Sequence, residues 1–140
     1  MHDNKRRHSR IDVKGEFKAT LYLVEDAPAV KNTPATTGIV KDYSKSGIGI
    51  FTVQPIALHK IVRIVIEQMK MGGDGKALKP HSLGPALEGR VVWSTKAKPE
   101  EKAPDTHPYR LGIDFMPRDD AAQEWMLKLY KLIQELEQTS

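Results

Sequence analysis

Apolar and polar residues alternate along most of this chain, with the period of two that is typical of half-buried β-strands. In residues 17–24, for example, Phe17, Ala19, Leu21 and Leu23 fall on one side of the predicted strand. Residues 60–68 are rich in β-branched side chains, which favour strands. The pattern predicts six strands, at residues 17–24, 39–43, 48–53, 60–68, 86–95 and 109–116.

The segments between these strands carry turn residues. A turn-rich stretch containing Pro28, Asn32, Pro34 and Gly38 separates the first two predicted strands, and residues 96–108 form a charged, proline-rich connection. No helical pattern separates any two strands, which argues against parallel βαβ units. Short antiparallel strands joined in this way predict a mainly β fold, a small β-barrel.

The last 24 residues change to a helical period. Apolar residues recur on one face at Trp125, Leu129, Leu132, Ile133 and Leu136. They predict an amphipathic helix over residues 120–138, capped by Asp119 or by Asp120, with Gln123 in the position of a capping box. Two interpretations stay open: the helix covers its own sheet, or it docks a partner or a second copy of the chain as a homodimer.

The composition is that of one soluble globular domain. The chain has 140 residues, of which 39% are hydrophobic and 29% charged. No stretch approaches the ~20 apolar residues that span a membrane, and no apolar segment follows the basic first residues as in a secretory signal. Cysteine is absent, which excludes disulfides and cysteine zinc sites and makes a cytoplasmic location the expectation.

Positive charge is concentrated at the amino end. The 22 basic and 18 acidic residues give a net charge of +4, and residues 1–10, with four basic residues and one acidic, hold +3 of it. The body is therefore nearly neutral, unlike the broad basic surface of a nucleic-acid-binding protein, and aromatic residues are only 6%. The basic run is either a solvated tail or part of one local anion site.

No catalytic or metal-binding pattern is present in the sequence. None of the five histidines has another histidine three or four residues away, as a helical metal site would need. The glycine-rich segment at 72–75 lacks the residues of a phosphate-binding loop, because Lys70 and Ala77 occupy two required positions. We therefore expect neither an enzyme nor a bound cofactor or metal.

Two short motifs remain. The first is an R-x-x-x-R spacing, from Arg6 to Arg10, in the basic run. The second is a D-x-S-x-x-G segment at a strand–turn–strand junction, formed by Asp42, Ser44 and Gly47. Each motif alone is common, because basic tails and Asp/Ser/Gly turns are common. Their occurrence in this order on one small barrel is much less frequent by chance.

With these motifs the chain resembles the PilZ domain, the bacterial receptor module for cyclic di-GMP. Gly89–Trp93 is similar to the family's G-x-V-x-W strand pattern, and Tyr109–Phe115 resembles its Y-R-x-G-x-x-F strand. The resemblance covers residues 5–117. Because Trp93 and Phe115 lie in alternating strands, we expect both in the core.

The resemblance implies a six-stranded antiparallel PilZ-type split barrel with a carboxy-terminal α-helix. A flexible arm at residues 1–11 carries the two arginines, the barrel spans 12–117, and the helix at 118–140 completes one domain. The departures from the family are the lengthened loops at 26–37, 70–85 and 94–108 and this helix.

The implied function is a cyclic di-GMP receptor that couples nucleotide binding to a conformational change, which an unidentified downstream protein recognises. Guanidinium groups can hold phosphates or guanine edges, and a carboxylate can accept guanine N1–H and N2–H₂. The alternative is a PilZ-like interaction adaptor with weak or no nucleotide binding. The implied ligand-binding residues are Arg6, Arg10, Asp42, Ser44 and Gly47, with Lys5, Arg7 and Arg110 as secondary candidates.

Overall fold

The computed structural model describes residues 11–13, 16–24, 34–70, 77–78, 87–117 and 119–139. Its elements, in chain order, are β1 (Ile11–Asp12), β2 (Glu16–Leu23), β3 (Pro34–Tyr43), β4 (Gly47–Thr52), β5 (Ile61–Lys70), β6 (Ala77–Leu78), β7 (Leu87–Lys96), the short 3₁₀ helix η2 (Pro99–Glu101), β8 (Tyr109–Phe115) and α1 (Asp120–Thr139).

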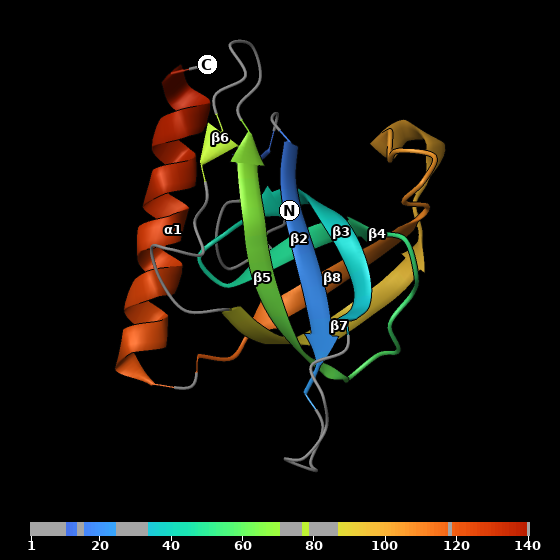
Figure 1. Cartoon of the computed structure of the whole chain (residues 1–140), viewed down its shortest axis with the longest axis horizontal. Coiled ribbons are helices and arrows are strands. Elements are labelled where there is room, and N and C mark those ends of the chain that lie inside the picture. Colours follow the sequence, from blue (N-terminus) through green and yellow to red (C-terminus); the bar gives the residue numbers. More distant parts are fainter. Residues whose placement is uncertain are drawn as a thin grey trace, which may run out of the picture.

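Six of the strands close into an antiparallel barrel, with the order β3-β2-β5-β7-β8-β4 and a final pairing of β4 with β3 (Figure 1). The two-residue strands β1 and β6 extend the sheet at β3 and β5. The closed six-stranded barrel confirms the predicted fold. Closure leaves the six strands without a free edge, which removes the pairing hazard of an open sheet.

The predicted alternation fills the barrel with apolar side chains. Each strand contributes inward residues that are almost fully buried, such as Phe17, Leu21, Ile64, Val91 and Ile113. Strand β4 differs from the others because both of its faces are buried. Ile48 and Ile50 fill the interior, so other side chains must cover the outer face of β4.

The turn predicted near Pro34 and Gly38 was wrong, because β3 already begins at Pro34. Proline is tolerated as the first residue of a strand, where no ladder hydrogen bond is lost. A Cβ atom on Gly38 would lie 2.4 Å from Cγ2 of Ile50 and 2.8 Å from the carbonyl oxygen of Phe51. This glycine therefore reflects close packing inside a sheet, which short-range sequence signals cannot distinguish from a turn.

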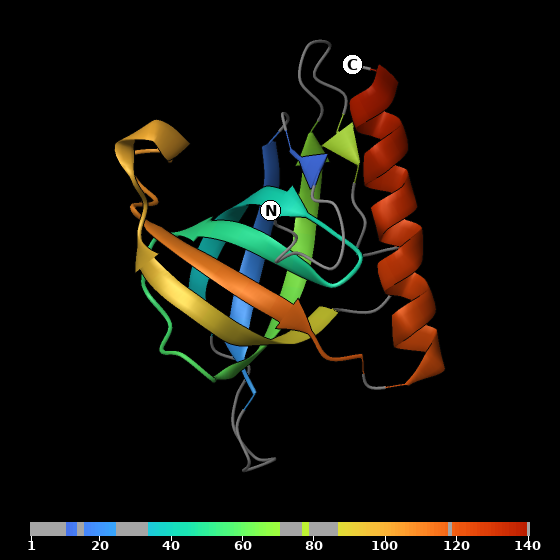
Figure 2. The same cartoon turned by 180° about the vertical axis from the view of Figure 1, so that it is seen from behind.

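Helix α1 lies along one side of the barrel (Figures 1 and 2). Its bounds agree with the predicted 120–138, and Asp119 is the cap, because its Oδ1 accepts a hydrogen bond of 2.9 Å from the amide of Ala122. The residues that it buries in the common core are Met126, Leu129, Tyr130 and Ile133. This burial confirms that the helix covers its own barrel.

Within the described residues, no helix combines the length and the apolar character that crossing a bilayer requires.

Candidate functional site

A bulge in β3 turns Asp42 to the outside of the barrel. The register of β3 with β4 shifts between Val40 and Asp42, so that Val40 and Tyr43 both point into the core. Asp42 pairs with Gly49 on one side and with Asp12 of β1 on the other. Its side chain lies on the outer face, yet the residue is only 2% exposed.

Two paired glycines form the floor of this outer face. Gly49 of β4 lies opposite Gly112 of β8 in the ladder. A Cβ atom on Gly49 would be 2.5 Å from Oδ1 of Asp42, and one on Gly112 would be 2.3 Å from Nε1 of Trp93. Glycine at both positions therefore allows the Asp42 and Trp93 side chains to lie flat across the strands.

Arg110 of β8 joins the side chains on this face into one cluster. Its guanidinium carbon lies 4.4 Å from the ring centroid of Trp93, and its Nη2 lies 3.5 Å from Oδ2 of Asp42. Nη1 contacts the carboxylate of Glu101, and Nζ of Lys41 lies 3.6 Å from Asp42 Oδ2. We call these five residues the Arg110 cluster. It holds the Asp42 carboxylate between two cations, with its position fixed by the packed guanidinium.

The Arg110 side chain also carries an unsatisfied donor. Its Nε is buried and makes no hydrogen bond to any residue that the structure describes, although its two terminal nitrogens face carboxylates. Buried donors are nearly always satisfied, so an unpaired one is notable at a candidate ligand site.

Ser44 and Gly47 shape the turn that follows Asp42. Ser44 Oγ accepts hydrogen bonds from the amides of Ser46 (3.2 Å) and Gly47 (3.1 Å), and the amide of Ser44 donates to the carbonyl of Gly47 (2.9 Å). A Cβ atom on Gly47 would lie 2.5 Å from the carbonyl oxygen of Ile113. Both motif residues therefore have a structural role in the turn, beside the ligand contact that the sequence predicts.

The residue between Asp42 and Ser44 faces the other way. Tyr43 is fully buried, and its hydroxyl donates to the carbonyl oxygen of Met126 in α1 (3.3 Å). Its ring lies 5.3 Å from the ring of Phe115 and 6.4 Å from that of Tyr130. Burial raises the pKa of the Tyr43 phenol well above its usual value. Neighbouring residues of β3 thus face opposite sides: Asp42 lies on the outer face, and Tyr43 contacts helix α1.

The predicted arm residues Lys5, Arg6, Arg7 and Arg10 lie outside the described residues. The strand that follows them is described: β1 pairs with β3, and this pairing places Asp12 opposite Asp42. The strand that begins directly after the basic run in the sequence therefore lies beside Asp42 in the sheet.

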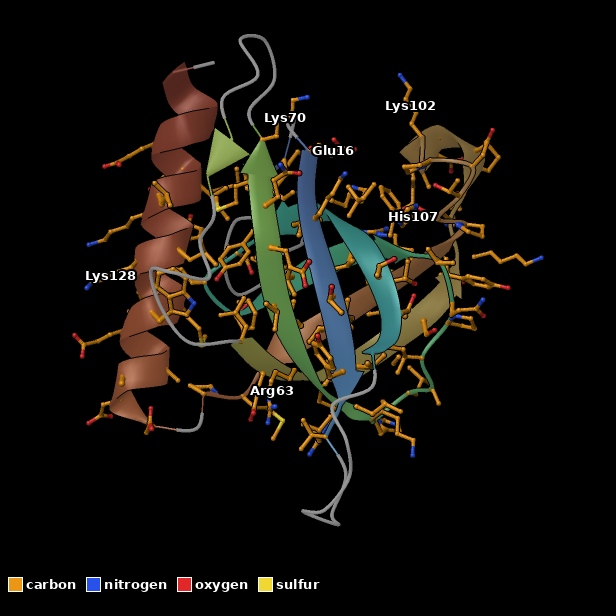
Figure 3. The ribbon with its side chains drawn as sticks, in the orientation of Figure 1. Glu16, Arg63, Lys70, Lys102, His107 and Lys128 are labelled. Carbon is orange, nitrogen blue, oxygen red and sulfur yellow. The ribbon has the colours of Figure 1, made fainter. Side chains whose placement is uncertain are left out.

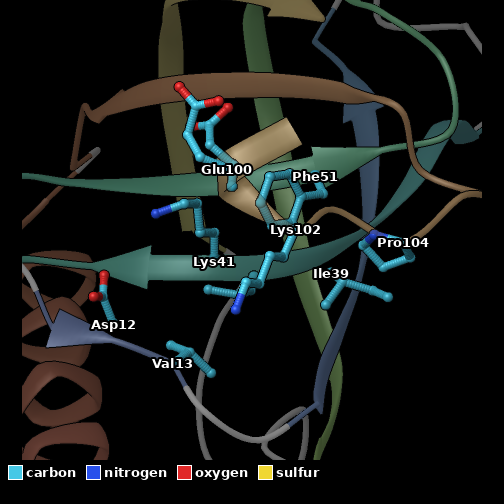
Figure 4. A pocket seen from close by; sticks show the side chains of 10 residues that line it. Asp12, Val13, Ile39, Lys41, Phe51, Glu100, Lys102 and Pro104 are labelled. Carbon is cyan, nitrogen blue, oxygen red and sulfur yellow. The ribbon is translucent and has the colours of Figure 1, made fainter. Parts of the chain in front are cut away.

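A pocket of about 540 Å³ adjoins the Arg110 cluster (Figure 4). It lies between β1, β3 and β4 on one side and residues 97–108, the β7–β8 connection, on the other. Its apolar lining is formed by Val13, Ile39, Val40, Phe51 and Pro104. Its charged lining is formed by Asp12, Lys41, Glu100, Glu101 and Lys102.

Three members of the Arg110 cluster were not anticipated as site residues: Lys41, Trp93 and Glu101. Trp93 was expected in the core, but it is half-buried on the outer face, where its ring packs against Arg110. Glu101 lies in the connection that the sequence marks only as charged and proline-rich. Phe115 does pack against the core, as expected.

No three or more His, Asp or Glu side chains among the described residues are grouped so that they could hold a metal ion. The Arg110 cluster on the outer face instead combines two carboxylates, two cations and an aromatic ring.

The comparisons with known proteins agree on one family. The sequence matches the family model described as PilZ domain over residues 4–131. No curated protein matches the sequence.

Several solved structures share the fold. The PilZ domain of YcgR from Escherichia coli with c-di-GMP has a TM-score of 0.58 at 16% identity, and the match covers 97% of this chain and 94% of that one. The PilZ domain of CeSA from a cellulose-synthesizing bacterium has a TM-score of 0.52 at 16% identity, with 90% and 98% covered. The MrkH–c-di-GMP complex of K. pneumonia has a TM-score of 0.60 at 14% identity, with 99% and 57% covered.

Proposed function

Since the chain belongs to the PilZ domain family, we propose that it is a receptor for cyclic di-GMP. In this proposal the nucleotide binds on the outer face of the barrel, between residues 5–10 and the segment Asp42–Gly47. The observation that carries the proposal is the Asp42 carboxylate, held beside Arg110 on a floor of glycine. Two of the similar structures, of YcgR and MrkH, were solved with c-di-GMP.

Asp42 has the chemistry that recognises guanine. Its carboxylate can accept hydrogen bonds from guanine N1–H and N2–H₂, whereas adenine offers no such pair of donors. Arg110 and Lys41 lie close to Oδ2 and restrain the orientation of the carboxyl group. A restrained acceptor loses less conformational freedom when the ligand binds, and this favours affinity.

The arginines of the amino-terminal motif supply the complementary cations. Arg6 and Arg10 can bind a phosphate bidentately or grip guanine O6 and N7, with Lys5 and Arg7 as secondary contacts. Four or five charge-assisted hydrogen bonds would contribute roughly 6–15 kcal/mol in total. Fixing residues 5–10 on the barrel opposes this by about 1–2 kcal/mol per residue, or roughly 6–12 kcal/mol in all. Most of the gain is therefore offset, and we expect an affinity no tighter than about micromolar, near −8 kcal/mol.

This balance implies a conformational output. Because much of the binding energy is used to fix residues 5–10, the bound and free forms differ mainly at the amino end, where a downstream protein can distinguish them. Hydrogen exchange of residues 3–12 with and without nucleotide measures this directly. Equal protection in the two states would contradict the coupling while leaving nucleotide binding itself intact.

Isothermal titration with cyclic di-GMP tests the binding. We expect Arg10→Ala to abolish measurable binding, and Asp42→Ala to reduce the preference for cyclic di-GMP over cyclic di-AMP more than it reduces phosphate affinity. Arg63→Ala is the matched control, because Arg63 lies on β5, which pairs with neither β3 nor β4, and forms an ion pair with Glu88. If the folded parent chain does not bind at millimolar nucleotide, the adaptor function replaces the receptor function.

A further inference from the structure

We infer that Lys102 contacts a phosphate of the bound cyclic dinucleotide, so that the β7–β8 connection forms a third wall of the site. This inference rests on the proposed receptor function and extends it to a segment that neither sequence motif includes. It is carried by three observations: the connection is ordered by its own hydrogen bonds, it is tied to Asp42 through Arg110, and Lys102 projects into the adjoining pocket.

The connection has a defined structure. The amide of Ala97 donates to the carbonyl of Pro108 (2.8 Å), which extends the β7–β8 ladder at its base. Above this pair, the amide of Glu101 donates to the carbonyl of Lys98 (2.9 Å) in η2, and Oε1 of Glu101 accepts from the amide of Lys98 (2.9 Å). Figure 3 shows the connection, with Lys102 labelled, on the side of the barrel opposite α1.

Glu101 ties this structure to the proposed nucleotide site. Its carboxylate contacts Nη1 of Arg110, whose Nη2 lies 3.5 Å from the Asp42 carboxylate. All three side chains are largely buried, so the contacts are little screened by solvent. A rigid chain of two ion pairs therefore connects the wall of the pocket to the carboxylate that is proposed to bind guanine.

Lys102 follows η2 in a left-handed backbone conformation, with φ 58° and ψ 39°. Here it ends η2 as a left-handed cap, in which the amide of Lys102 donates to the carbonyl of Pro99. The side chain extends from the end of η2 across the pocket towards strand β3 (Figure 4). The ion pairs among the described residues do not include Lys102, whereas Lys41, the other lysine of the pocket, lies beside Asp42.

The pocket as a whole suits a base joined to a phosphate. Ile39, Phe51 and Pro104 provide an apolar surface for a flat ring, and Lys102 provides a cation for a phosphate. The carboxylates of Asp12 and Glu100 can accept hydrogen bonds from base N–H groups. The charge of Glu101 is already matched by Arg110 and therefore does not repel an anion at full strength.

The test compares cyclic di-GMP titrations of the parent chain, Lys102→Gln and Lys96→Gln at low and high salt. We expect Lys102→Gln to bind about tenfold more weakly, as for the loss of one charge-assisted contact. Lys96 is exposed at the end of β7, and strand alternation turns it away from the face of Arg110, so its substitution removes the same charge with no effect on affinity. The difference in affinity between the parent chain and Lys102→Gln should become smaller near 1 M salt, where charges are screened beyond about 3 Å.

A second pair of variants separates charge from backbone shape. Lys102→Gly is compatible with the left-handed conformation but has no cation, so it should weaken binding as Lys102→Gln does, while Lys102→Arg should bind nearly as the parent does. Parent-like affinity of both Lys102→Gln and Lys102→Gly would overturn the inference and leave the receptor function intact. Absence of binding by the folded parent chain would overturn both.

Discussion

Arg110 is the residue whose removal should disturb the outer face most. The exposed fractions of the three paired side chains are 15% for Arg110, 3% for Asp42 and 13% for Glu101. Arg110→Met keeps an unbranched side chain but leaves two largely buried carboxylates without this cation. Breaking a buried pair in this way costs about 3–5 kcal/mol, and the partial exposure of two partners places the expected loss near 3 kcal/mol.

Urea unfolding measures this loss as a lower midpoint at an unchanged slope. For a chain of this size, about 3 kcal/mol corresponds to a fall in Tm of roughly 10 °C. Asp42→Asn in the Arg110→Met background removes one of the two buried charges that have lost Arg110. It should restore at least about 1 kcal/mol of unfolding free energy, and a double-mutant cycle measures this as a coupling free energy.

A matched ion pair provides the control for this prediction. Arg63 and Glu88 lie 3.5 Å apart, but the Arg63 side chain is 35% exposed. Arg63→Met should therefore cost less than about 1 kcal/mol. If Arg110→Met is no more destabilising than Arg63→Met, or if it is strictly additive with Asp42→Asn, Arg110 does not hold the Asp42 carboxylate in place.

Three further changes test other contacts. Gly49→Ala should weaken cyclic di-GMP binding about tenfold, because the new Cβ would lie 2.5 Å from Oδ1 of Asp42; parent-like affinity in a titration would contradict the glycine floor. Asp119→Ala should lower the unfolding free energy by about 1 kcal/mol in urea, because the cap of α1 is lost, and an unchanged midpoint would refute that role. Tyr43→Phe removes the hydrogen bond to Met126, with an expected loss of about 1 kcal/mol near neutral pH. Burial raises the pKa of Tyr43, so the parent should also lose stability as the pH rises above about 10, where the phenol ionises in the unfolded chain. Tyr43→Phe should lack this loss. If the unfolding free energies of the parent and of Tyr43→Phe fall in parallel above about pH 10, this role of Tyr43 is contradicted.

The sequence predicts the barrel well because strand alternation is a local property. The inward residues of β2 and β4 follow directly from their period of two. The beginning of β3 did not follow, because Pro34 and Gly38 are turn residues locally, and only the approach of Ile50 explains Gly38. Packing between strands distant in sequence overrides local signals of this kind.

In the candidate site, too, the local motif could be predicted, whereas the contacts between distant segments could not. Asp42, Ser44 and Gly47 form a contiguous motif, so their position at a strand–turn–strand junction could be predicted, and the structure confirms that junction. The contacts of Arg110 with Trp93 and Glu101 depend on the register of β7 with β8 and on the path of the β7–β8 connection. Neither is encoded in a short pattern, which is why the orientation of Arg110 could not be predicted.

The inward orientation of Tyr43 changes how the D-x-S-x-x-G motif should be interpreted in this chain. A pattern search treats the letter between Asp42 and Ser44 as a wildcard, as if any amino acid could stand there. Here that letter is an aromatic ring enclosed by Phe115, Tyr130 and the backbone of α1. In a saturation mutagenesis survey, the unspecified position should therefore tolerate fewer alternatives than many of the specified ones.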